Sequence, residues 1–83
     1  MNQVLVKLYV PDIEKIYDVW IPSHKRIYNV ISLLVKAINE MNDNSYRKND
    51  MPSLYDKVTA KAYDINLSIK ETDIRNGTEL VLM

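Results

Sequence analysis

Apolar residues alternate with other residues near the start of the chain, a period that is typical of β-strands. Between residues 4 and 10, every second position is apolar, and the residues between them are Leu5, Lys7 and Tyr9. Most residues of this segment are β-branched or aromatic, so we predict a strand. Pro11 and Asp12 follow it and indicate a turn.

A second segment with the same period covers residues 16–21. Tyr17, Val19 and Ile21 should face one side of this strand, and Asp18 and Trp20 the other, which Asp18 marks as the solvent side. Because the link between the two segments is short, we expect an antiparallel hairpin. Proline cannot donate a hydrogen bond to a strand ladder, so the residue after Ile21 should end the second strand.

The period changes to that of an amphipathic helix between residues 26 and 41. Ser23 is the nearest side chain suited to cap its first turn, with a cap one or two residues later as the alternative. The apolar residues follow steps of three and four, and we expect all of them in the core: Ile27, Val30, Ile31, Leu34, Ile38 and Met41.

Residues 42–52 have the composition of a loop, with Tyr46 and Met51 as candidate anchors. Two short strands are then predicted at residues 54–58 and 62–65, with a turn at residues 59–61. Residues 66–73 should form a turn and one helical turn, with Leu67 and Ile69 pointing inward.

The last strand is predicted at residues 78–82, with Leu80 and Leu82 on the core side. A turn at residues 75–77 should precede it, and Gly77, the only glycine, should adopt a positive φ there. The predicted fold is therefore of the α+β class, a β-grasp in which one main helix packs across a mixed sheet of four to five strands. We expect residues 1–83 to form one domain.

The composition excludes several functions. The 11 basic and 11 acidic residues balance, so we expect no nucleic-acid partner. No cysteine is present to bind an iron–sulfur cluster or to act as a nucleophile, and His24 is the only histidine. No metal-ligand spacing occurs, so we expect no cofactor and no enzyme activity. No apolar run reaches the ~20 residues of a membrane span, which predicts a cytoplasmic protein that does not insert directly into the membrane.

Parts of the sequence resemble ubiquitin. Pro22-Ser23 followed by residues 27–30 is similar to the passage from the second strand of ubiquitin into its helix. Residues 69–74 and 77–82 are similar to its closing short helix, turn and final strand. Residues 63–80 (YDINLSIKETDIRNGTEL) resemble the C-terminal half of the YukD/EsaB-like family, bacterial ubiquitin-like proteins associated with type VII (WXG100) secretion.

The resemblance implies a non-catalytic ubiquitin-like interaction module, a cytoplasmic accessory of a type VII secretion system whose partners are components of that machinery. A ubiquitin-type modifier or sulfur carrier would need a Gly-Gly terminus, whereas this sequence ends Glu79-Leu80-Val81-Leu82-Met83, so we expect it to bind partners without being conjugated to them. The alternatives are a β-grasp regulatory or adaptor protein of an unrelated pathway and, with less support, a modifier or sulfur carrier.

The remaining candidate is a protein-interaction face. Leu5, Tyr9 and Trp20 fall on the predicted outer face of the sheet, where an exposed tryptophan is suited to anchor a partner. The competing interpretation is that Trp20 lies flat on its neighbours and only shields the sheet. Apolar outer-face residues and open strand edges also predict a weak homodimer.

Overall fold

The computed structural model describes residues 2–43, 46 and 51–83. Strand β1 (Gln3–Val10) and strand β2 (Lys15–Pro22) form the predicted antiparallel hairpin, in register with Val6 opposite Val19. A 3₁₀ turn, η1 (Pro11–Ile13), joins them, and Glu14 completes the reversal at a φ of 52°.

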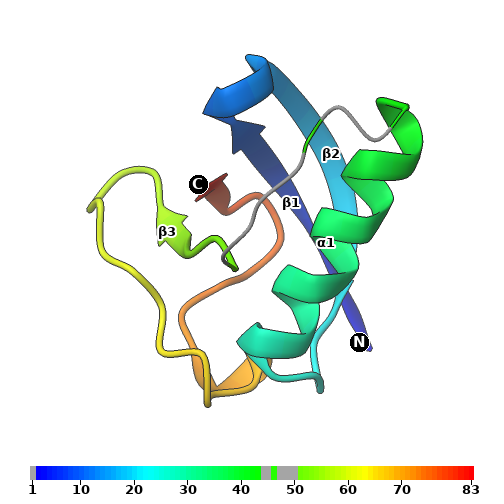
Figure 1. The fold of residues 1–83 in the computed structure, drawn as a ribbon. Coiled ribbons are helices and arrows are strands. Elements are labelled where there is room, and N and C mark those ends of the chain that lie inside the picture. The colour runs from blue at the N-terminus through cyan, green and yellow to red at the C-terminus, as the bar shows by residue number, and fades with distance from the viewer. Residues whose placement is uncertain (1, 44–45, 47–50) are drawn as a thin grey trace.

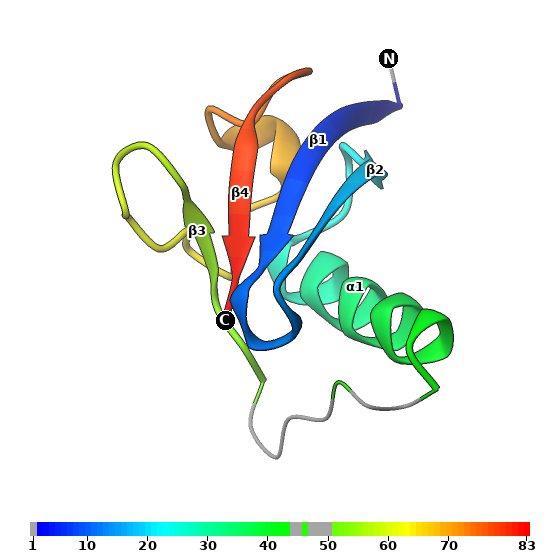
Figure 2. The same ribbon diagram turned by 90° about the horizontal axis from the view of Figure 1, so that it is seen from above.

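Strand β4 (Glu79–Leu82) lies beside β1 and runs parallel to it, with Leu8 opposite Leu80. Strand β3 (Leu54–Asp56) pairs antiparallel with β4, which gives a four-stranded mixed sheet in the order β2-β1-β4-β3 (Figure 2). The two central strands therefore come from opposite ends of the described chain. This is the predicted β-grasp arrangement, with four strands.

Helix α1 (Ile27–Met41) packs across one face of this sheet (Figures 1 and 2). Met41 was predicted to lie in the core, but at the last helical position it is 57% exposed, so the buried stripe ends one turn earlier. The helix contributes the other five residues of the predicted stripe to the core: Ile27, Val30, Ile31, Leu34 and Ile38.

The start of the helix differs from the prediction. The N-cap residue is Arg26, whose side chain makes no capping bond, so Ser23 as a helix cap was wrong. The Ser23 N–H donates instead to the carbonyl of Asn2 at 2.8 Å and extends the ladder between β1 and β2.

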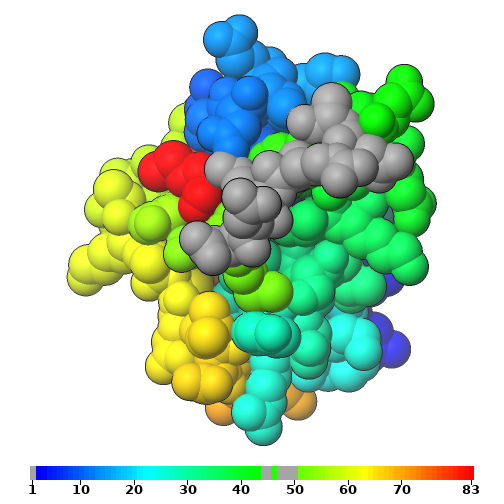
Figure 3. Space-filling view, in the orientation of Figure 1, coloured from blue at the N-terminus to red at the C-terminus, as the bar shows by residue number. Residues whose placement is uncertain are grey.

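A distant backbone segment takes the place of a side-chain cap. The Ile27 N–H donates to the Leu67 carbonyl at 2.8 Å, and the Tyr28 N–H donates to the Ile65 carbonyl at 3.1 Å. The first N–H groups of a helix have no partner within it, so these bonds satisfy donors that a serine or aspartate would otherwise serve. Figure 3 shows this segment, in yellow, packed beside the teal start of the helix.

The predicted strand at residues 62–65 was wrong, because only an isolated bridge between Tyr55 and Ala62 forms there. The strand predicted at 54–58 ends already at Asp56. The reason is local: Asp56 Oδ1 accepts hydrogen bonds from the N–H groups of Val58 at 2.8 Å and Thr59 at 3.1 Å, which turns the chain out of the ladder. The predicted turn at 59–61 follows, with Ala60 at a φ of 63°.

Tyr46 is buried and anchors its loop as expected, but Met51 is 43% exposed and does not. The other positions of that loop lie partly outside the described residues. The helical turn η2 (Ile69–Glu71) is present and begins with a capping box, in which the Ser68 side chain accepts from the Glu71 N–H and Glu71 Oε1 accepts from the Ser68 N–H. Ser68 Oγ also donates to Glu71 Oε1. Gly77 has the predicted positive φ, 90°.

We predict that Leu80→Ala lowers the free energy of unfolding by about 2–5 kcal/mol, because it empties a fully buried site on a central strand. Deletion of residues 79–83 should abolish folding, since it removes β4 from the middle of the sheet. Urea unfolding followed by circular dichroism measures both effects. Val81→Ala, on the outer face of the same strand, is the control and should cost clearly less; equal losses would contradict this assignment of the core.

Candidate interaction site

The outer face of the sheet, opposite the helix, carries the residues that the sequence singled out. Leu5 lies opposite Trp20 in the register of β1 and β2, and Trp20 is 54% exposed. The pair therefore brings a half-buried leucine and an exposed tryptophan together on the face that strand alternation predicts for both. We call these two residues the Leu5–Trp20 pair.

Tyr9 lies on the same face but belongs to a different group. It is opposite Ile16 on one side and Val81 on the other, and Val81 is in turn opposite Tyr55. The Lys57 ammonium lies 6.0 Å from the centre of the Tyr9 ring, within the range of a cation–π contact. Ile16 is 59% exposed, so this second apolar group also reaches solvent.

A charged row separates the two groups. Lys7 is opposite Asp18 on β2 and opposite Glu79 on β4. The signs alternate across the three strands, which favours this register because opposite charges on cross-strand neighbours attract. Sequence reasoning missed Val81, Tyr55 and the charged row, because they are brought together by strand pairings that no local pattern reveals.

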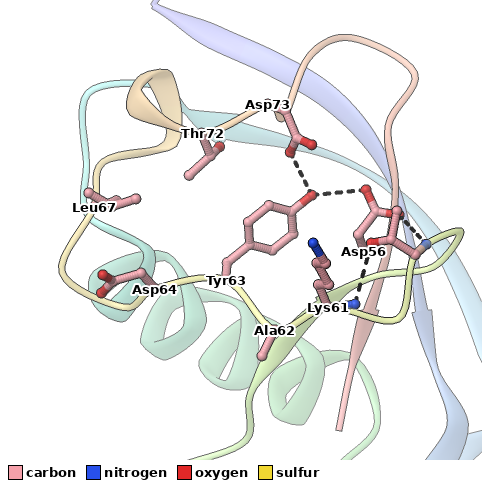
Figure 4. Close-up of a pocket in the computed structure, with 9 residues that line it drawn as sticks. Asp56, Lys61, Ala62, Tyr63, Asp64, Leu67, Thr72 and Asp73 are labelled. Carbon is pink, nitrogen blue, oxygen red and sulfur yellow. Dashed lines mark hydrogen bonds between the residues drawn. The ribbon is translucent and has the colours of Figure 1, made fainter.

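A second candidate site is a pocket beside β3, with a volume of about 330 Å³ (Figure 4). Its central side chain is Tyr63, which points between two carboxylates. The Tyr63 hydroxyl lies 3.0 Å from Asp73 Oδ1 and 3.1 Å from Asp56 Oδ2. A phenol has one proton, so it can donate to only one of these carboxylates at a time.

The electrostatics of this pocket follow from burial and from that geometry. Burial first, and then the hydrogen bonds to Asp73 and Asp56, raise the pKa of Tyr63 well above its usual value. The N–H groups of Thr59 and Val58 hold the pKa of Asp56 below its usual value. The pocket therefore keeps a neutral phenol between two carboxylates, which ties together β3 and the segment after η2.

Within the described residues, no group of three or more His, Cys, Asp or Glu side chains could hold a metal ion. His24 lies elsewhere, on an exposed turn that borders a shallow hollow with Trp20 and Pro22. Among residues 2–43, 46 and 51–83, no helix is long and apolar enough to cross a membrane.

Comparisons with known proteins agree on the fold. No protein-family model matches the sequence, and no curated protein matches it. Solved structures do match. The ubiquitin-like domain of the type VII secretion system protein EccD1 of Mycobacterium tuberculosis has a TM-score of 0.78 at 12% identity, covering 99% of this chain and 98% of that one. The EccD5 ubiquitin-like domain of Mycobacterium xenopi has a TM-score of 0.78 at 19% identity, covering 100% and 94%.

A larger assembly contains the same fold. A chain of the MycP5-free ESX-5 inner membrane complex matches with a TM-score of 0.81 at 16% identity. The match covers 100% of this chain but only 21% of that chain. The protein thus has a ubiquitin-like β-grasp fold, and its structural neighbours include ubiquitin-like domains of type VII secretion proteins.

We predict that the Tyr63→Phe variant loses less stability than the wild type as the pH is raised into the alkaline range. Because the pKa of Tyr63 is higher in the folded protein, its contribution is complete below about pH 10, the ordinary tyrosine value, and is lost as the pH rises further. The free energy of unfolding in urea should therefore begin to fall near pH 10 and continue to fall at higher pH in the wild type, and it should fall less in the variant.

Two features make the result interpretable. Burial also raises the pKa of Tyr46, so part of the pH dependence of the free energy of unfolding should remain in the Tyr63→Phe variant. Tyr28→Phe, at a ring that is 49% exposed, is the matched control for the loss of a phenol hydroxyl. An unchanged slope in Tyr63→Phe would show that the phenol does not titrate as described.

Proposed function

We propose that this chain is a non-catalytic protein-interaction module of a bacterial type VII secretion system, related in role to the YukD/EsaB-like proteins of WXG100 secretion. Residues 1–83 act as one ubiquitin-like domain in the cytoplasm and bind components of the secretion machinery. The observation that carries the proposal is the match of the whole fold to ubiquitin-like domains of EccD1 and EccD5.

The outer sheet face supplies the contact. The Leu5–Trp20 pair combines a half-buried aliphatic side chain with an exposed indole, and large aromatic residues of this kind often dominate binding energy. Tyr9 extends the contact at the other end of β1, and the charged row of Lys7, Asp18 and Glu79 lies between them and fixes the orientation of the partner.

Binding without conjugation fits the sequence better than a modifier or sulfur carrier. Residues 1–83 contain a single glycine, Gly77, which is held in a turn, and they include no Gly-Gly pair of the kind that an activating enzyme uses. A β-grasp adaptor of an unrelated pathway would share every structural feature described above, and the identity of the bound partner separates the two proposals.

The test is affinity purification of the tagged protein from a host that expresses a type VII secretion system. A component of that system should be recovered with the wild type. Recovery should fall about 30-fold with Trp20→Ala, the loss expected when a hot-spot residue is truncated. Val58→Ser is the matched control, since Val58 is 82% exposed on the loop after β3. Recovery of no secretion component would refute the pathway, and equal recovery with Trp20→Ala would refute the contact.

We further propose that the protein forms a weak homodimer through its apolar outer face. The weight-average mass from light scattering should rise from the monomer value as the protein concentration increases into the millimolar range, because the groups around Trp20 and Ile16 are small. Leu5→Ser should suppress the rise. A constant monomer mass over the whole range would exclude the dimer.

A further inference from the structure

The two edges of the sheet differ in how they are finished. On the β3 edge, the Asp56 N–H donates to the Lys61 carbonyl at 2.9 Å, and the Tyr63 N–H donates to the Leu54 carbonyl at 2.9 Å. The segment at residues 61–63 therefore covers that edge. On the opposite side, β1 is the only strand that pairs with β2 in the described part of the chain. The β2 edge is open, and an open edge presents backbone groups that can pair with another strand.

The register between β1 and β2 shows which backbone N–H and carbonyl groups of β2 can pair with another strand. The Ser23 N–H bonds to the Asn2 carbonyl, so Ser23 and every second residue before it direct their backbone groups toward β1. The intervening residues, Ile16, Asp18 and Trp20, direct their N–H and carbonyl groups away from β1. Pro22, next in this series, has no N–H and limits the free edge to three residues.

A groove runs between this edge and helix α1. It encloses about 270 Å³ and is lined almost entirely by apolar side chains, among them Val19 and Ile21 of β2 and Val30 and Leu33 of the helix. Leu33 is 50% exposed on its rim. Side chains alternate between the two faces of a strand, so a strand added to β2 would direct every second side chain into this groove.

From the open edge and the groove together, we infer that β2 binds an extended peptide segment of a partner protein as a fifth strand. The segment carries apolar residues at alternate positions, which fill the groove, and a lysine or arginine opposite Asp18. This inference rests on the proposed function, because it names the binding mode and the chemistry of the partner. It is a case of recognition by strand addition.

Charge favours a different chain over a second copy as the occupant. In the symmetric antiparallel register that pairs Ile16 with Trp20 of a second copy, Asp18 would lie opposite its own counterpart, and like charges in that position repel. A basic residue opposite Asp18 would instead continue the alternating row that already runs through Lys7 and Glu79. The edge thus opposes a second copy and favours a basic, apolar strand.

The experiment begins with a phage-displayed library of random twelve-residue peptides, selected on the immobilised protein. The enriched peptides should carry apolar residues at alternate positions together with a lysine or arginine. The most enriched peptide is then added to isotope-labelled protein, and amide hydrogen exchange is measured by NMR. At saturation, exchange should slow at least 10-fold at Ile16, Asp18 and Trp20, and change little at Tyr17 and Val19, whose N–H groups already bond to β1.

Variants test the two recognition elements separately. Leu33→Ser, in the groove, should weaken binding of the peptide about 10-fold, whereas Tyr28→Ser, at an equally exposed helix position outside the groove lining, should not. Asp18→Lys should weaken binding of the basic peptide by a similar factor and should enrich peptides with aspartate or glutamate from the same library.

The remaining outcomes overturn the inference. No enriched peptide, or slowed exchange elsewhere than at the three outward amides, would exclude strand addition. Protection of these amides that increases with protein concentration, without peptide, would identify a second copy as the occupant. If a Leu33→Ser bait still recovers the secretion component that Trp20→Ala loses, the proposed function stands and this inference fails.

Discussion

The parallel pairing of β1 with β4 is the constraint on which the rest of the structure depends. Parallel neighbours cannot be joined by a tight turn, so the chain between them must leave the sheet and return. The helix lies on that path and covers the face where Leu8 and Leu80 meet. The same pairing makes β4 an internal strand and leaves β2 and β3 as the two edges. One contact between distant segments thus sets the layers, the core and the location of every surface described above.

Local patterns predicted the elements whose causes are local. Alternation of apolar residues predicted β1, β2 and β4, and the steps of three and four predicted α1, because burial on one side imposes those periods. The predictions failed where a single side chain or a distant backbone segment determines where an element begins or ends. Asp56 ends β3 by accepting two backbone N–H groups, and the carbonyls of Ile65 and Leu67 replace the serine cap expected for the helix. Neither interaction has a periodic signature.

The candidate surfaces also divide into those that local patterns predicted and those that depend on contacts between distant segments. Strand alternation correctly put Leu5 and Trp20 on one face, because the hairpin register follows from a short local connection. It could not show that Tyr9 groups with Val81 and Tyr55, which reach it through β4. The pocket around Tyr63 brings together one carboxylate that precedes Tyr63 in the sequence and one that follows it, and no local pattern predicted this arrangement. The sequence predicted open strand edges without showing which strands form them, and the strand order places β2 at one of these edges.

The backbone bonds that serve the first turn of the helix have a consequence for folding. A helix with its own side-chain cap can begin to form from local interactions, but here the donors of Ile27 and Tyr28 are satisfied only after residues 65–67 arrive. Formation of the helix is therefore coupled to closure of a long loop, whose entropic cost is incurred before the contacts form. The two halves of the molecule should consequently fold in a concerted step, with a slower rate than the helix content alone would suggest.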